Sequence, residues 1–224
     1  MFPLKDTQPS YTRPVVTIAL IAVNLLVFLF EVSLGPYNRN ALIEYYGLVP
    51  DQVRFSSILT SMFLHGGWLH VLGNMWFLWI FGDNIEDLLG HWKYLMFYLL
   101  CGVAAAVGQV VSNPYSTVPM VGASGAIAGV MGAYLVKFPR ARVLTLVFIL
   151  FFITTIEIPA PIMLAYWFVI QLFSGIGEFA RTHVSQGGTA FFAHVAGFVV
   201  GMVLVKVMGS SGQYNRRRDR YWND

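Results

Sequence analysis

The stretch HGGWLHVLGNMW, residues 65–76, places His65, His70 and Asn74 in a run that otherwise has the composition of a membrane-spanning helix. Polar side chains are expensive inside a bilayer and are usually retained for a function. The whole chain has 224 residues, of which 57% are hydrophobic and 11% are charged, and its mean hydropathy is +0.64. A soluble domain carries roughly 25% charged residues. The composition therefore predicts a membrane protein with a single domain.

Six apolar runs come close to the roughly 20 residues that a membrane-spanning helix needs. They cover 14–34, 67–82, 92–111, 121–137, 160–179 and 190–208. The run at 143–153 is too short to span comfortably and is followed by Glu157, Pro159 and Pro161, so we place it at the interface as part of a connection. An alternative makes it a seventh helix, which would move the C-terminus to the opposite side. The favoured fold is an all-α bundle of six transmembrane helices.

The positions of the basic residues predict how this bundle is oriented. With both termini in the cytoplasm, eleven of the fourteen Lys and Arg residues lie on the inner side, in agreement with the positive-inside rule. The chain then divides into a cytoplasmic segment (1–13), the membrane domain (14–208) and a basic tail (209–224) that we expect to be disordered. The tail is interpreted as a topology anchor and not as a nucleic-acid site. The absence of an Arg- and Ser-rich transit peptide favours a bacterial plasma membrane.

Several polar side chains fall at a similar depth in three of the runs. His70, Ser124 and His194 each lie twelve or thirteen residues from the charged residue that ends the run, about 18–20 Å from the inner face at 1.5 Å per residue. Asn74 lies about 14 Å from that face and shares one side of its helix with His70, four residues earlier. His65 is separated from His70 by two glycines and belongs to the preceding loop.

Small residues at helical spacing accompany this polar layer. They are Ser124, Ala128 and Gly132 in the fourth run, and His194, Gly197 and Gly201 in the sixth. Such stripes let helix backbones approach closely. The fourth and sixth helices should therefore pack tightly enough to bring Ser124 and His194 within hydrogen-bond reach.

The fourth run is short. Residues 121–137 cover about 24 Å, less than the roughly 30 Å of a hydrocarbon core. Its N-terminus should be sunk below the outer surface, where non-helical backbone must line a water-filled cavity or be buried in protein. Such a cavity would admit water, and Ser124 would lie in the first turn, where backbone N–H groups are unpaired.

These residue types suit acyl transfer. A serine hydroxyl needs a base to become a good nucleophile, and His194 can take its proton and return it to the leaving amine. The oxyanion of the tetrahedral intermediate would be stabilised by the Ser124 backbone N–H, the Asn74 side chain and His70. No carboxylate lies at this depth on the other helices, so we predict a Ser–His dyad.

Each of these residues also has a simpler explanation. A serine in a Gly/Ala-rich helix is usually a packing residue, an asparagine often joins helices, and a buried histidine can be structural. A zinc site is disfavoured because the five-residue His65–His70 spacing does not place two ligands on one helical face. A transporter with His70 and His194 as a proton relay would be expected to show inverted repeats, and the sequence has none. The sequence predicts no cofactor and no metal.

The chain resembles the rhomboid intramembrane serine proteases in three motifs. H-x4-H-x3-N corresponds to His65, His70 and Asn74, and G-x-S-G corresponds to Gly122, Ser124 and Gly125. A-H-x2-G-x3-G corresponds to Ala193, His194, Gly197 and Gly201. The resemblance covers about 14–208 and implies the six-helix bacterial type of this fold.

The resemblance also implies roles for individual residues. Ser124 would be the nucleophile, His194 the base, His70 and Asn74 the oxyanion donors, and His65 a structural residue beside the site. The motif glycines would support this arrangement, and Glu86 would stabilise the turn after the second helix. Some members have an aromatic residue four positions after the serine that packs on the histidine. Ala128 occupies that position here.

Substrates and partners follow from the same resemblance. The expected substrates are single-span membrane proteins cut at small residues, and the expected partners are these proteins and membrane lipid. Trp167, Phe168 and the loop 181–190 would gate access, so truncating either aromatic side chain should raise the cleavage rate. The alternative is a catalytically silent relative that binds or escorts membrane proteins. The presence of both Ser124 and His194 disfavours it.

Overall fold

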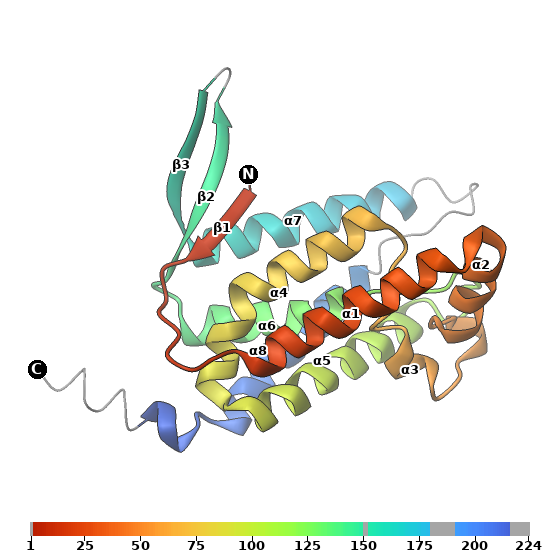
Figure 1. The fold of residues 1–224 in the computed structure, drawn as a ribbon, viewed down its shortest axis with the longest axis horizontal. Helices are drawn as coiled ribbons and strands as arrows, with labels where there is room; N and C mark the ends of the chain where they lie inside the picture. The colour runs from red at the N-terminus through yellow and green to blue at the C-terminus, as the bar shows by residue number, and fades with distance from the viewer. Residues whose placement is uncertain (1, 150–151, 180–190, 216–224) are drawn as a thin grey trace, which may run out of the picture.

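The computed structural model describes residues 2–149, 152–179 and 191–215, and each of the six predicted apolar runs forms a helix (Figure 1). These helices are α1 (Val15–Ser33), α4 (Trp68–Leu89), α5 (His91–Ser112), α6 (Ser124–Lys137), α7 (Ala160–Phe179) and α8 (Phe191–Met208). The long connection between the first two contains α2 (Gly35–Tyr46), the 3-10 turn η1 (Pro50–Gln52) and α3 (Ser57–Thr60).

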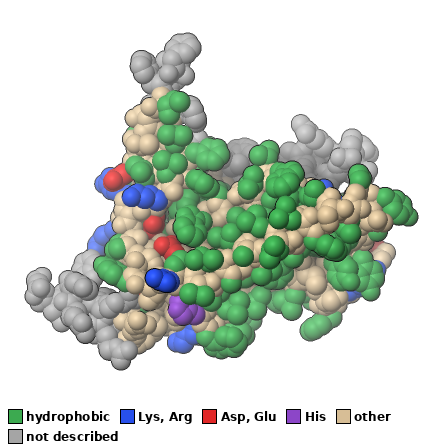
Figure 2. All heavy atoms as spheres, in the orientation of Figure 1, with side chains coloured by type: hydrophobic (Ala, Val, Ile, Leu, Met, Phe, Trp, Pro, Cys, Tyr) green, Lys and Arg blue, Asp and Glu red, His purple; other side chains and the backbone are tan. Residues whose placement is uncertain are grey.

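The helical body is covered by apolar side chains. Figure 2 shows hydrophobic side chains over most of the helices, while the charged side chains of this face gather at the end where α1 begins. Three helices in the described part of the chain, α1, α5 and α8, are long and apolar enough to cross a membrane. The chain is therefore a membrane protein.

Helix α6 lies at the centre of the bundle, and every residue from Gly125 to Tyr134 is buried. Its main neighbour is α8, where a Cβ at Gly197 would overlap the carbonyl oxygen of Gly125 and one at Gly201 would overlap that of Gly129. The two backbones are therefore in direct contact. The contact stripe on α6 includes the predicted Gly132, but Gly125 and Gly129 take the places predicted for Ser124 and Ala128, each of which is one residue earlier in the chain.

The prediction of an all-α fold is wrong at the end of the bundle where α1 begins. Strands β1 (Phe2–Asp6), β2 (Arg142–Ile149) and β3 (Phe152–Pro159) form an antiparallel sheet in the order β1-β2-β3. The run at 143–153 is thus not a seventh helix; it is part of the connection between α6 and α7, as predicted, but its described residues form strands. It supplies β2 and the start of β3, because it is rich in β-branched residues, which fit a strand better than a helix. The hairpin projects from the bundle (Figure 1).

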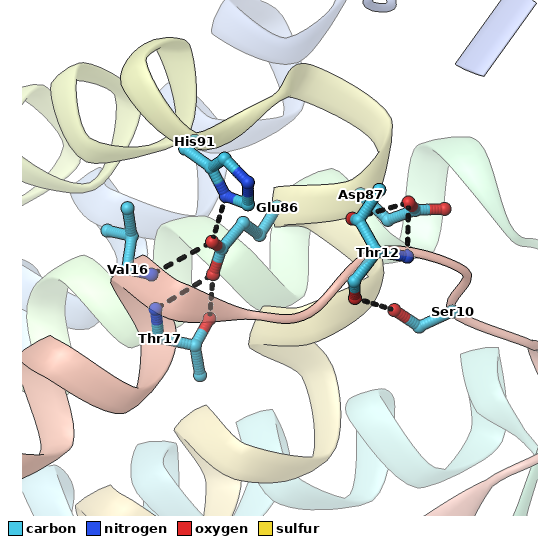
Figure 3. A network of polar contacts seen from close by, with 7 residues as sticks. All are labelled: Ser10, Thr12, Val16, Thr17, Glu86, Asp87 and His91. Carbon is cyan, nitrogen blue, oxygen red and sulfur yellow. Dashed lines mark hydrogen bonds and ion pairs between the residues drawn. The ribbon is translucent and has the colours of Figure 1, made fainter. Parts of the chain in front are cut away.

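Helix α4 continues to Leu89, seven residues beyond the predicted end at 82, because its acidic residues have partners (Figure 3). The buried Glu86 carboxylate accepts hydrogen bonds from the backbone N–H groups of Val16 and Thr17 and from the Thr17 hydroxyl. These N–H groups belong to the first turn of α1, where a helix has no internal acceptors. Asp87 accepts from the N–H and hydroxyl of Thr12. The sequence predicts that Glu86 lies in the turn after this helix, but Glu86 lies within α4; its contact with His91, the first residue of α5, spans that turn.

Residues 209–215 of the predicted tail are described, and Ser211 donates its backbone N–H to the Leu88 carbonyl oxygen at 2.7 Å. Lys93 also donates to the Met208 carbonyl oxygen. The rest of the tail, which we predict to be disordered, lies outside the described residues.

Asp6 joins the sheet to the bundle and should make stability depend on pH. It accepts a hydrogen bond from the Tyr134 hydroxyl, and burial raises the pKa of Asp6 to about 6. The folded protein then holds this proton more tightly than the unfolded chain, so stability is greatest below the unfolded pKa and falls as pH rises through about 6. We expect the free energy of unfolding to fall by about 1 kcal/mol over this pH range, after discounting for the partial exposure of Asp6. This loss corresponds to a decrease in Tm of roughly 2–4 °C.

The measurement is Tm at pH 4.5 and pH 7 for wild type and Asp6→Asn. The difference between the two pH values should shrink in Asp6→Asn and stay unchanged in Asp51→Asn, whose side chain is exposed on η1. If Tm depended equally on pH in wild type and Asp6→Asn, Asp6 would not be the group that causes the pH dependence.

Candidate functional site

Ser124 and His194 meet where α6 begins. Ser124 is the first residue of α6, and its Oγ lies 2.7 Å from His194 Nε2 on α8. His194 is 5% exposed, whereas Ser124 is partly exposed. The hydroxyl can donate to the imidazole nitrogen in this geometry, which is the contact that a general base needs. Ser124 and His194 therefore lie within hydrogen-bond reach, as the sequence predicts.

The close packing of α6 and α8 explains this contact. Gly125 follows Ser124 directly, and its carbonyl oxygen touches the backbone at Gly197, three residues after His194. A pair of glycines, each within one helical turn of one of the two side chains, therefore fixes the spacing between them. The predicted supporting residues Gly125, Gly197 and Gly201 all lie in this contact.

Asn74 and His70 lie beside the loop that leads into α6. Gly122 has φ +124°, in the region that favours glycine, and a Cβ there would lie 2.7 Å from the His70 ring and 3.5 Å from Asn74 Nδ2. A side chain at 122 would overlap the His70 ring, which would have to move, and would be in ordinary contact with Asn74. The loop backbone is held in turn by the Gly122 N–H, which donates to the Ser61 carbonyl oxygen at 2.9 Å.

The buried side chain of His65 orients Asn74. Asn74 Nδ2 lies 3.0 Å from His65 Nε2, and burial, with the neighbouring His70, lowers the pKa of His65 to about 3. His65 is therefore neutral near pH 7, and Nε2 can accept one amide hydrogen of Asn74. An amide group has two N–H donors, so the second hydrogen of Asn74 is left for another acceptor.

Sequence reasoning missed the residues that hold His65. Glu31, fully buried on α1, accepts the His65 backbone N–H at 3.1 Å. Arg39 on α2 donates to the His65 carbonyl oxygen at 2.9 Å, lies 3.7 Å from Glu31 Oε2 and packs over the Phe28 ring. The available signal was an acidic residue within the first apolar run, which is costly unless it is paired.

A tryptophan packs on the His194 ring. The Trp167 ring of α7 lies 5.6 Å from the His194 ring and 6.4 Å from that of Phe77. Among the described residues, His194 Nδ1 has no hydrogen-bond partner. Ala128, which is buried, has no ring to pack on His194. Trp167 makes an aromatic contact of this kind from a different helix.

A cavity of about 20 Å³ adjoins Ser124, lined by residues that include Ser61, Met120, Gly122 and Ala193. A water molecule needs at least about 10–15 Å³ measured in this way. The space beside the serine therefore fits a single water.

The sequence that forms this site is similar to that of a known protein family. The family profile described as "Rhomboid domain" matches residues 52–211, which include His65, Asn74, Ser124 and His194. The chain belongs to the rhomboid family. The rhomboid domain thus contains every residue that carries the predicted motifs.

Relatives of this rhomboid come from mitochondria and from a bacterium. The human presenilin-associated rhomboid-like protein, mitochondrial, is 36% identical over 158 residues, which are 68% of this chain and 38% of that protein. The rhomboid protease GluP of Bacillus subtilis is 33% identical over 127 residues, 55% of this chain and 24% of GluP. Rhomboid protein 1, mitochondrial, of Saccharomyces cerevisiae is 27% identical over 206 residues, 89% of this chain and 55% of that protein.

The chain spans about a quarter to a little over half the length of these relatives. Since they include both mitochondrial and bacterial proteins, they do not favour the bacterial plasma membrane that the sequence predicts.

Proposed function

We propose that this rhomboid is an intramembrane serine endopeptidase that hydrolyses peptide bonds of single-span membrane proteins with a Ser124–His194 dyad. The observation that carries the proposal is the 2.7 Å contact between Ser124 Oγ and His194 Nε2 at the start of α6. It is supported by the name of the relative GluP, a rhomboid protease.

The reaction uses the dyad twice. His194 takes the proton of Ser124 as Oγ attacks the substrate carbonyl carbon, and the protonated imidazole then gives it to the leaving amine. The products of this half are the amine fragment and an acyl ester on Ser124. Water in the adjacent cavity, deprotonated by His194, hydrolyses the ester and restores the serine.

The oxyanion of each tetrahedral intermediate is held by groups that the fold has already oriented. The Ser124 backbone N–H lies in the first turn of α6, where it has no helical acceptor. The second amide hydrogen of Asn74 and the His70 ring, both beside Gly122, would supply the other donors. Donors fixed in advance stabilise developing charge without reorganisation.

The membrane arrangement that we propose has six spans with both termini on the cytoplasmic side. Helix α6 has 14 residues, about 21 Å at 1.5 Å per residue, which is shorter than a hydrocarbon core of roughly 30 Å. We place its first turn below the outer surface, so that Ser124 acts within the bilayer and reaches bonds in or near a substrate's span.

Covalent labelling tests the nucleophile. Purified protein in detergent should react with a fluorophosphonate probe at Ser124, mapped by mass spectrometry. His194→Gln should abolish the reaction, because no other described side chain contacts the hydroxyl. Labelling of another serine, or none by a folded protein that retains substrate binding, would favour the catalytically silent alternative.

The aromatic residues of α7 should have opposite effects. The Phe168 ring contacts only Phe191 and Phe198 among described rings, so Phe168→Ala should loosen α7 from α8 and raise the cleavage rate severalfold. Trp167→Ala should lower kcat about tenfold, because a misplaced catalytic group can cost up to about 10²-fold. Because Trp167 contacts His194, we expect Trp167→Ala to lower the cleavage rate, whereas the sequence alone predicts that it raises this rate.

These variants are compared by kcat and KM on a single-span substrate in liposomes. Tyr166→Ala, which removes an exposed side chain of the same helix, is the matched control and should change neither value. If Trp167→Ala and Phe168→Ala raised kcat equally, Trp167 would only control the access of the substrate and would not position His194.

A further inference from the structure

A second cavity lies at the other end of the bundle. This N-terminal cavity measures about 450 Å³ and is enclosed by β1, the segment 10–14 and the middle of α4. Tyr134, which contacts Asp6 at its edge, is ten residues after Ser124, about 15 Å along α6. The N-terminal cavity is therefore separate from the Ser124–His194 site, and its volume is typical of ligand pockets, which measure roughly 300–1,000 Å³.

Charges of both signs line the N-terminal cavity without pairing. Lys5 and Arg13 are the cations, and Asp6 and Asp83 are the carboxylates. None of the four takes part in an ion pair within the part of the chain that the structure describes. In Figure 2 the acidic and basic side chains of this face gather where the sheet meets the helices.

Neither carboxylate forms an ion pair with a described residue, although the Lys5 ammonium is near enough to Asp6 to attract it. Asp6 accepts from the Tyr134 hydroxyl and Asp83 from the Asn84 backbone N–H at 2.8 Å, both uncharged donors. The two groups are close enough to repel each other. A cation with several N–H donors between them would relieve the repulsion and fill their remaining acceptor positions.

The position of the cavity indicates an amphiphile as the ligand. Pro14 lines it and directly precedes α1, one of the three apolar spans. Trp79 on α4 also lines it and is 54% exposed, and tryptophan is enriched at the level of lipid headgroups. The N-terminal cavity is thus bordered by the start of an apolar helix and by an exposed tryptophan, as a site for a lipid headgroup would be.

We propose that the N-terminal cavity binds the headgroup of a phospholipid that carries a phosphate and a primary ammonium, the phosphatidylethanolamine class. The phosphate lies near Lys5 and Arg13, and the ammonium lies between Asp6 and Asp83. A choline headgroup has no N–H to donate to the carboxylates, and an anionic headgroup has no cation to place between them.

Native mass spectrometry of the purified protein tests this binding without relying on proteolysis. Phosphatidylethanolamine, phosphatidylcholine and phosphatidylglycerol with identical acyl chains are titrated separately, and the first should bind about tenfold more tightly than the others. Asp6→Asn, Asp83→Asn and the double variant should reduce this preference at least severalfold, with folding checked by Tm. Asp51→Asn, remote on η1, should keep it.

Two results would overturn the proposal. Equal affinity for the ethanolamine and choline lipids in wild type would remove the role of the ammonium, whatever the variants do. Tightest binding of phosphatidylglycerol would mean that the basic residues attract anionic lipid in general. Because the assay measures lipid and not cleavage, an inactive protease would leave its result valid.

Discussion

Ser124→Ala is expected to reduce cleavage of a single-span substrate to background, a loss of at least about 10⁴-fold in kcat. Without the hydroxyl there is no nucleophile for His194 to activate, and the acyl ester cannot form. The fold should survive, because Ser124 is partly exposed and its side chain has no described partner besides His194. The measurement is the rate of product formation by purified protein in detergent, with Tm as the check on folding.

Two controls make the result specific. Because the dyad acts as a unit, His194→Ala and the double variant should be about as inactive as Ser124→Ala alone. A chelator should leave the wild-type rate unchanged, since no metal takes part in the proposed reaction. Persistent cleavage by Ser124→Ala, or its loss on chelation, would refute the serine mechanism.

The core of the site could be predicted because it depends on helical spacing. His70 and Asn74 share a face since four residues make about one turn, and counting 1.5 Å per residue placed Ser124 and His194 at one depth. Ser124 and His194 do meet, although α4 does not end where its first acidic residue appears. Relative depth depends on the rise of a helix, whereas the end of a helix depends on which partners its charges find.

The remaining parts of the structure depend on contacts between distant segments. Nothing local to 143–153 indicates that residues 2–6 will add a third strand to its hairpin. Likewise, Glu31 and Arg39 hold the backbone of His65 from two other helices, and Trp167 reaches His194 from α7. A single sequence gives the chemistry of each such residue but not which residue it faces.

Gly197→Ala is expected to disable the site by a purely steric route. The added methyl group would overlap the Gly125 carbonyl oxygen, and backbone cannot move aside as a flexible side chain can. Helices α6 and α8 must then separate, which stretches the 2.7 Å contact between Ser124 and His194. Overpacking of this kind costs about 1–3 kcal/mol of stability. A displacement of about 1 Å can cost 10²-fold in rate.

The matched control is Gly73→Ala, one residue before Asn74 on α4, where an added Cβ would meet nothing within 4 Å. Both changes add one methyl group to a helix, and alanine favours the helix by about 1 kcal/mol at an unhindered position. Gly73→Ala should therefore keep its cleavage rate and have a Tm equal to or slightly above that of wild type, while Gly197→Ala loses about 10²-fold in rate and has a lower Tm. Wild-type activity in Gly197→Ala would mean that the site tolerates a wider spacing of α6 and α8. The backbone contact at Gly125 would then not be what sets the distance between nucleophile and base.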